Sequence, residues 1–220
     1  MGVLAAALIA QVLALVAQTP GVHPISGRRF AQVMSAAGAD WLDRPERIDE
    51  EDPDRAIAIL SIPRGATVAD VGAGSGYITV KLAARVGPTG KVYATDIQAE
   101  MIGLLRQRLA TLRLENVVAV QGTVDDPKLP PSVLDLELLV DVYHEFSEPQ
   151  AMLKHLRTAL KPDGRLVLLE YRKEDPSIPI RPEHKMSVAE AKLEVEAEGF
   201  SLSKVDESLP RQHILVFTKR

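Results

Sequence analysis

The sequence predicts an α/β fold built on a doubly wound, mainly parallel sheet. Five apolar runs of strand length alternate with segments of helix length between residues 67 and 171. Two connections contain the residues that end a helix before the next strand begins, Gly87-Pro88-Thr89-Gly90 and Lys161-Pro162-Asp163-Gly164. Parallel strands need such helical crossovers, and the crossover helices cover both faces of the sheet.

The individual elements follow from local signals. Asp52 is an acidic N-cap before Pro53 at the first helical position, and this pair predicts a helix that runs to about Leu60. The next strands are predicted at residues 67–71, 91–96, 117–121, 133–140 and 165–171. Helices are predicted between them at about 77–85, 99–112 and 149–160.

The C-terminal part has a different pattern. Ser187 and Glu190 form a capping box, which predicts a helix that closes on Gly199. Two apolar runs follow, 200–206 and 213–219, and the loop between them is too short for a helix. These last two strands are therefore predicted to be antiparallel neighbours.

Residues 1–20 differ from the rest of the chain. The run Val3–Ala17 is apolar apart from Gln11, which suits a secretory signal and falls short of the roughly 20 residues of a membrane span. We expect a signal peptide or membrane anchor, and thus a membrane-associated or exported protein. A packed N-terminal helix in a cytoplasmic protein is the alternative. Residues 21–52 are expected to form an N-terminal extension, with His23 at its surface, ahead of the main domain at 53–220.

Composition excludes several classes of protein. Among 220 residues, 46% are hydrophobic and 25% are charged, which is ordinary globular usage and argues against disorder. The formal net charge of −4 gives no general attraction to phosphate backbones, so nucleic acid is not an expected partner. The chain has no cysteine, which excludes disulfides, thiolate nucleophiles and Cys-based metal sites. No metal site is predicted, and the oligomeric state stays open.

A glycine-rich turn follows the first predicted strand. In VADVGAGSGYIT, Gly72, Gly74 and Gly76 precede a helix, so backbone N–H groups can approach a ligand closely. The spacing differs from the dinucleotide pattern G-x-G-x-x-G, and Asp70 favours a ligand with positive charge. Asp96 ends the next strand about 20 residues beyond Gly76, where an acid can accept both ribose hydroxyls. The pattern indicates a nucleoside with a cationic tail. Alternatively, the glycines serve only a tight turn and Asp96 only caps a helix.

Four motifs in order resemble those of the class I S-adenosylmethionine-dependent methyltransferases. They are VADVGAGSG, YATD, VLDLELLVDVYHEF and LKPDGRLVLLEYR, and the similarity extends from about Trp41 to the C-terminus. The resemblance implies a Rossmann-like sheet of seven strands with the last strand antiparallel. It also implies that residues 53–220 are a methyltransferase domain with S-adenosyl-L-methionine as cofactor.

The resemblance assigns cofactor-binding roles to matching positions. The three glycines would contact the methionine part and ribose of the cofactor, with Asp70 near its amino group. Asp96 would hold the ribose hydroxyls, and Ile97 and Met101 would pack on the adenine. The remaining candidates are in the loops or at the element ends that border the pocket: Tyr77, Thr123, Val124 and Asp141.

The loop after the third strand departs from the family pattern. This loop normally offers an acid to the adenine amino group, and here Thr123 occupies that position in Gly122-Thr123-Val124-Asp125. Val124 can still bind adenine through its backbone, and Asp125 is a candidate substitute.

Catalytic candidates follow the fourth strand, at the edge where ligands of open α/β sheets bind. His144 is the candidate base, Glu145 its orienter, and Tyr143 a wall or hydrogen-bond donor. Alternatively, His144 and Glu145 only line the entry to the next helix. Tyr171 and Arg172 end the fifth strand at the same edge, and His184 is in a loop, EDPSIPIRPEHKM, that can act as a lid.

The acceptor class is narrowed by what the sequence lacks. The Asn/Asp-Pro-Pro-aromatic motif of amino-group methyltransferases is absent, since the fourth strand continues as DVYH, and arsenite methylation needs cysteines. The chain is similar to the bacterial group that includes the ubiquinone/menaquinone C-methyltransferases, which implies a small-molecule or lipid-like acceptor. A nicotinamide-dependent oxidoreductase and a non-catalytic S-adenosylmethionine-binding protein are the alternatives.

Overall fold

The computed structural model describes residues 21–220. The predicted signal or anchor at residues 3–17 lies outside these described residues. Within them, none of the helices has both the length and the apolar character needed to cross a membrane. This finding corrects the prediction of a membrane-associated or exported protein, because that prediction depended on the apolar N-terminal run alone.

The described chain contains seven strands, with helices in every connection except β3–β4 and β6–β7. The strands are β1 (Thr67–Val71), β2 (Lys91–Asp96), β3 (Val117–Gln121), β4 (Leu134–Val140), β5 (Leu160–Tyr171), β6 (Phe200–Asp206) and β7 (Gln212–Lys219). The α-helices are α1 (Arg47–Glu51), α2 (Pro53–Ile59), α3 (Tyr77–Val86), α4 (Ala99–Leu112), α5 (Pro149–Ala159) and α6 (Val188–Ala197). Three 3-10 helices complete the set: η1 (Ala36–Asp43), η2 (Tyr143–Glu145) and η3 (Pro182–His184).

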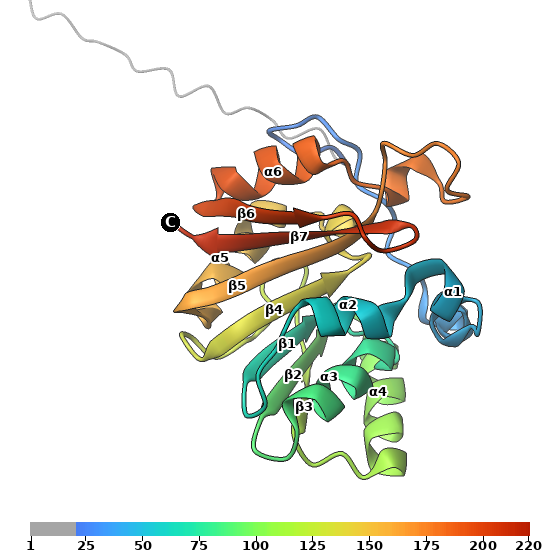
Figure 1. Cartoon of the computed structure of the whole chain (residues 1–220), viewed down its shortest axis with the longest axis vertical. Helices are drawn as coiled ribbons and strands as arrows, with labels where there is room; N and C mark the ends of the chain where they lie inside the picture. The colour runs from blue at the N-terminus through green and yellow to red at the C-terminus, as the bar shows by residue number, and fades with distance from the viewer. Residues whose placement is uncertain (1–20) are drawn as a thin grey trace, which may run out of the picture.

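The strands form one sheet in the order β3-β2-β1-β4-β5-β7-β6 (Figure 1). Strands β1 to β5 pair in parallel, and β7 pairs antiparallel with both β5 and β6. The direction reverses at β7 because the loop from β6 is too short for a crossover helix. The predicted doubly wound seven-stranded sheet with an antiparallel last strand is confirmed.

Helices cover both faces of the sheet and bury its alternating apolar side chains. Leu138 packs with α2 and α3 on one face, and its neighbour Leu139 packs with α5 and α6 on the other. Helix α4 extends the first layer over β2, where Ile102 and Leu105 pack with Ala94 (Figure 1). This two-sided burial explains the nearly continuous apolar runs of the strands.

Strand β5 begins earlier than the sequence predicts. Leu160 already pairs with Leu134, and the register shifts between Leu134 and Leu136. The residues of the predicted turn, Pro162 to Gly164, therefore lie within this irregular strand start. A Cβ on Gly164 would be 2.7 Å from the Leu134 carbonyl oxygen, so the close approach of the two strands requires glycine there.

The segment before α2 packs against the main domain. It begins beside α6 and continues to η1 and α1 near α2 (Figure 1). The expectation that His23 is a surface residue is wrong, since its exposed fraction is 1%. Its ring Nδ1 accepts hydrogen bonds from the backbone N–H groups of Ile25 and Ser26, and its Nε2 faces Glu194 of α6. These polar partners account for a buried histidine in a segment of polar composition.

Candidate functional site

A cavity of about 560 Å³ opens at the carboxyl ends of β1, β2, β4 and β5. Chain order reverses between β1 and β4, and such a switch point leaves a crevice at this edge of a parallel sheet. The predicted residues that line the cavity are Gly72, Gly74, Asp96, Ile97, Met101, Thr123, Val124, Asp141, His144, Glu145, Tyr171 and His184.

The glycine turn requires its glycines for close packing. A Cβ on Gly72, where φ is +74°, would be 2.5 Å from Val142 Cγ2. A Cβ on Gly74, where φ is +53°, would be 2.7 Å from Leu42 Cδ1. The turn thus brings bare backbone to the cavity and lets two other segments approach it.

Asp96 is held at one end of the cavity by backbone hydrogen bonds. Its Oδ2 accepts from the Gly74 N–H at 3.0 Å, and its Oδ1 accepts from the Gln98 N–H at 2.9 Å. Burial raises the pKa of Asp96, and these two N–H donors oppose that effect. Each carboxylate oxygen keeps a lone pair for a further donor, such as a hydroxyl group.

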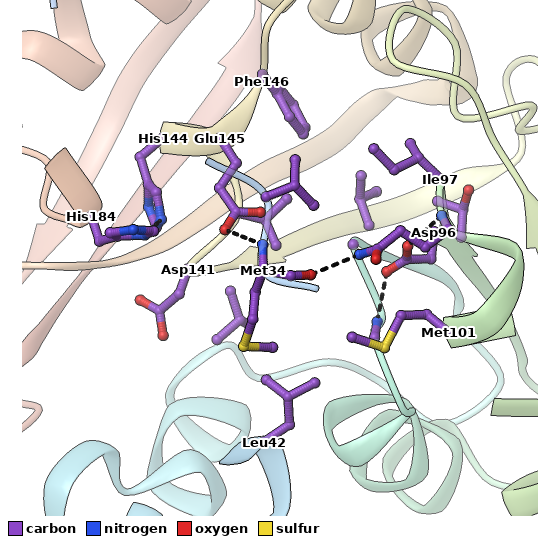
Figure 2. Close-up of a pocket in the computed structure, with 18 of the residues that line it drawn as sticks. Met34, Leu42, Asp96, Ile97, Met101, Asp141, His144, Glu145, Phe146 and His184 are labelled. Carbon is purple, nitrogen blue, oxygen red and sulfur yellow. Dashed lines mark hydrogen bonds between the residues drawn. The ribbon is translucent and has the colours of Figure 1, made fainter. Parts of the chain in front are cut away.

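Apolar and loop residues complete this end, which we call the Asp96 end. Ile97 and Met101 lie next to Asp96 (Figure 2). Thr123 and Val124 line the same cavity, and the Thr123 hydroxyl donates to Asp125 Oδ1 at 2.6 Å. Asp125 is therefore engaged with Thr123 in this structure.

Several predicted residues do not line the cavity. The Asp70 carboxylate lies beneath the turn, accepts from the Thr79 hydroxyl at 2.6 Å, and has its pKa raised to about 6 by burial. Gly76 is the N-cap of α3, and the Tyr77 ring faces the Arg47 guanidinium, 4.7 Å from the ring centroid. Tyr143 is fully buried in the core beside Phe146.

His144, Glu145 and His184 gather at the other end, which we call the His144 end. In the view of Figure 2, His144 and His184 lie on one side, Asp96 and Met101 on the other. His144 Nε2 lies 3.2 Å from His184 Nδ1. Glu145 accepts from the Met34 N–H at 3.3 Å, and burial raises the pKa of Glu145 to about 7.

The carboxylate that holds the His144 ring is Glu170, not the predicted Glu145. Glu170 Oε2 lies 2.5 Å from His144 Nδ1, and Oε1 accepts from the Tyr143 N–H at 2.9 Å. Burial lowers the pKa of His144, but the charge and hydrogen bond of Glu170, together with the charges of Glu145 and Asp141, outweigh it and the net direction is upward. Sequence reasoning missed Glu170, although an acid inside the apolar run of β5 is a signal for a buried polar partner.

Asp141 also lines the cavity, on the same side as His144 and His184 in Figure 2, with one oxygen unsatisfied. It follows β4 in a left-handed conformation, with φ at +53°. Its Oδ2 accepts from Gln212 Nε2 at 2.7 Å, while Oδ1 is buried and has no hydrogen-bond partner among residues 21–220. Tyr171 also lines the cavity, whereas Arg172 donates to the carbonyl groups of Leu209 and Gln212 and does not.

The N-terminal segment supplies a wall that sequence reasoning missed. Val33, Met34, Trp41 and Leu42 line the cavity, and Met34 is held by Gln98, which donates to its carbonyl group at 2.9 Å. No motif in this polar, proline-punctuated stretch indicates that role, because the contacts depend on the fold of distant elements.

These features fit a cationic nucleoside. The cavity volume is in the usual range of about 300–1,000 Å³ for small-ligand sites. Asp96 offers free lone pairs at the apolar Asp96 end, and the unpaired Asp141 Oδ1 is a buried acceptor suited to an ammonium group. The fold and this site define a nucleoside-binding α/β protein with space for a second ligand at the His144 end.

Comparisons with known proteins agree with this class. Residues 62–207 match the family model described as Methyltransferase domain. The ubiquinone/menaquinone biosynthesis C-methyltransferase UbiE of Escherichia fergusonii is 33% identical over 118 residues, which is 53% of this chain and 47% of that protein. The chain thus spans about half the length of the curated relatives it matches.

Solved structures show the same fold. The crystal structure of a SAM-dependent methyltransferase from Aquifex aeolicus has a TM-score of 0.79 at 29% identity, over 84% of this chain and 98% of that one. A TehB-like SAM-dependent methyltransferase from Corynebacterium glutamicum has a TM-score of 0.62 at 19% identity, over 84% and 100%, and shares the fold. The chain belongs to the class I S-adenosylmethionine-dependent methyltransferases, and the predicted family and cofactor are confirmed.

Proposed function

We propose that the protein transfers the methyl group of S-adenosylmethionine to a small, largely apolar acceptor bound at the His144 end of the cavity. The observation that supports this proposal is the continuity of one cavity from Asp96 to His144. The cavity wall as a whole is more apolar than polar, and its apolar residues include Val33, Met34 and Phe146. Such a wall suits an aromatic or quinone-like molecule better than a charged one.

The cofactor would occupy the Asp96 end. Asp96 would accept the ribose hydroxyls, Ile97 and Met101 would contact the adenine, and Asp141 would accept from the ammonium group. When bound, S-adenosylmethionine supplies an electrophilic methyl group. The protein then has to place the acceptor in line, exclude water and remove one proton from the acceptor.

His144 is the proposed base. The 2.5 Å contact between its Nδ1 and the Glu170 carboxylate favours a proton on Nδ1, so the Nε2 lone pair faces the cavity. The acceptor's O–H or activated C–H proton passes to Nε2 as the acceptor atom gains the methyl group. Glu170 stabilises the imidazolium that forms.

The test is methyl transfer with labelled cofactor. The purified chain is incubated with S-adenosylmethionine carrying a trideuterated methyl group and with a panel of phenols, quinols and demethylated quinone precursors, and products are identified by mass. Transfer to an apolar acceptor supports the proposal. Cofactor binding with no transfer to any member of the panel contradicts it and favours the non-catalytic binding protein.

A further inference from the structure

Two imidazoles and a carboxylate converge at the His144 end. The ligand atoms of His144, Glu145 and His184 all lie within 4.8 Å of one another, and all three side chains line the cavity. They come from different elements, since His144 and Glu145 belong to η2 and His184 to η3. The two 3-10 helices are distant in sequence, so the fold rather than a local motif creates this cluster.

The spacing of the two rings matches that of ligands on one metal ion. His144 Nε2 and His184 Nδ1 are 3.2 Å apart. Two nitrogens bound to one tetrahedral zinc ion at about 2.0–2.1 Å lie roughly 3.3 Å apart. The separation of the two nitrogens is therefore already close to the one that coordination of a single ion requires.

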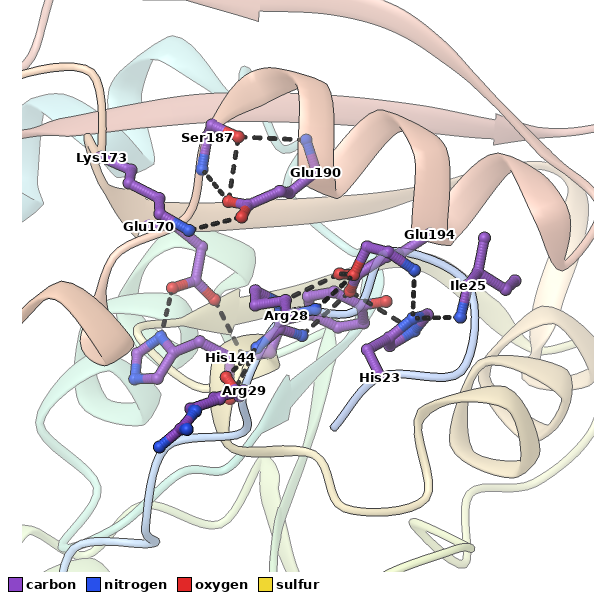
Figure 3. Close-up of polar contacts among 12 residues, drawn as sticks. His23, Ile25, Arg28, Arg29, His144, Glu170, Lys173, Ser187, Glu190 and Glu194 are labelled. Carbon is purple, nitrogen blue, oxygen red and sulfur yellow. Dashed lines mark hydrogen bonds and ion pairs between the residues drawn. The ribbon is translucent and has the colours of Figure 1, made fainter. Parts of the chain in front are cut away.

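Glu170 supplies the support that a metal-binding histidine typically has. Its carboxylate is fully buried and contacts His144 Nδ1, the ring nitrogen that faces away from His184. Figure 3 shows the Glu170 carboxylate against the His144 ring. A carboxylate in this position fixes the ring and leaves Nε2 on the side of His184. Glu170 is itself held by the Tyr143 N–H.

We propose that His144, Glu145 and His184 bind one divalent first-row transition metal ion, with Zn²⁺ as the best-matched probe. Two imidazoles and one carboxylate form a donor set that suits such ions and disfavours Mg²⁺ and Ca²⁺, which prefer oxygen ligands alone. Three protein ligands leave a coordination position free, and the cluster borders the cavity, so that position faces the proposed acceptor.

The metal site would change the task of His144. In the metal-free protein Nε2 is a proton acceptor at hydrogen-bond distance from His184 Nδ1, whereas in the metal-bound protein it would donate its lone pair to the ion. An acceptor hydroxyl bound to the ion would then ionise at lower pH, because the cation stabilises the resulting oxyanion. The inference concerns ion binding and stands or falls independently of methyl transfer.

The test is ion binding by the full chain without an affinity tag, after treatment with a chelator. Isothermal titration with Zn²⁺ is expected to give one ion per chain, and Mg²⁺ is expected not to bind at the same concentration. His184→Ala should weaken Zn²⁺ binding at least about 100-fold, since loss of an outer partner alone costs about 10–100-fold. Glu145→Gln should also weaken it, and Glu170→Gln should do so by about 10–100-fold.

His155→Ala is the matched control, because His155 is half exposed, contacts Asp126 and lies outside the cluster. It should leave Zn²⁺ affinity unchanged. S-adenosylmethionine affinity of His184→Ala, measured in parallel, reports that the variant is folded. Absence of Zn²⁺ binding, or equal affinity in His184→Ala and the parent chain, overturns the proposal whether or not methyl transfer is found.

Discussion

Arg28 and Glu194 form a buried ion pair with two hydrogen bonds. Arg28 Nε lies 3.0 Å from Glu194 Oε1, Nη2 lies 2.9 Å from Oε2, and both side chains are almost fully buried (Figure 3). Arg28 Nη1 also donates to the carbonyl group of His144 at 3.0 Å. One guanidinium therefore joins the N-terminal segment to α6 and to the backbone of η2 at the cavity.

Removal of one partner of this pair should be strongly destabilising. Glu194→Ala leaves the Arg28 charge buried without a counter-ion, which costs about 3–5 kcal/mol of unfolding free energy. Urea denaturation of the two proteins measures the difference. Lys192→Ala on the same helix breaks only an exposed pair with Glu196 and should cost less than about 1 kcal/mol. Equal losses of unfolding free energy in both variants would show that the buried pair contributes no more to stability than the exposed one.

Asp96→Ala should weaken S-adenosylmethionine binding by about 1.5–3 kcal/mol, the range for hydrogen bonds that involve a charged group. This corresponds to a dissociation constant raised about 10- to 150-fold. Isothermal titration measures it, with Asp54→Ala as a control, because Asp54 is exposed and pairs with Lys81 on the surface. An unchanged dissociation constant in Asp96→Ala would refute the ribose assignment.

His144→Ala should lower turnover by about 10²–10⁴-fold, the usual contribution of a general base. Cofactor affinity should stay near that of the parent chain, because His144 lies away from the Asp96 end (Figure 2). Steady-state rates and cofactor titration on one preparation separate the two quantities. Parallel losses in both would indicate a structural role for His144.

Asp70 should make the protein less stable as pH rises from about 4 to 6. Its pKa is raised from 3.8 to about 6 by burial, so the folded state binds more protons than the unfolded state in this window. The stability associated with its protonated form is complete below pH 3.8 and is lost as pH rises through 6. The unfolding free energy lost over this range is about 3 kcal/mol, at 1.36 kcal/mol per pKa unit.

Asp70→Asn isolates this effect. Asparagine can still accept from the Thr79 hydroxyl but does not ionise. The unfolding free energy of the variant should therefore lack the pH dependence that Asp70 contributes. Urea midpoints at pH 4, 5 and 6 for both proteins measure the difference, and all other groups cancel in the comparison. Parallel curves over this range would exclude Asp70 as the source.

Much of the fold and the Asp96 end of the cavity were predictable from the sequence. The glycine turn and Asp96 are close together in sequence and belong to adjacent parallel strands, so local signals were sufficient to place them at one edge. The capping box at Ser187 also formed as predicted, with both of its reciprocal hydrogen bonds. These features depend on neighbours within a few residues or on one strand pairing.

Other site features depend on distant contacts that a periodic pattern does not encode. Tyr143 and His144 are adjacent, yet the 3-10 turn places one in the core and the other at the cavity. The Glu170 contact joins residues of two strand ends, and the His184 contact joins two loops. His144 and His184 were predicted as separate candidates, and no motif indicated that their side chains would be in contact.

The wall formed by Val33, Met34, Trp41 and Leu42 precedes residues 62–207, the part that matches the methyltransferase family. Under the proposed function, acceptor selection would draw on both stretches, because His144, Phe146 and His184 lie within residues 62–207. Exchange of residues 21–43 between relatives would alter the shape offered to the acceptor and would also change the contacts of Leu42 with Gly74 and of Met34 with Gln98. The N-terminal segment would in this sense set the acceptor wall and the position of the glycine turn together.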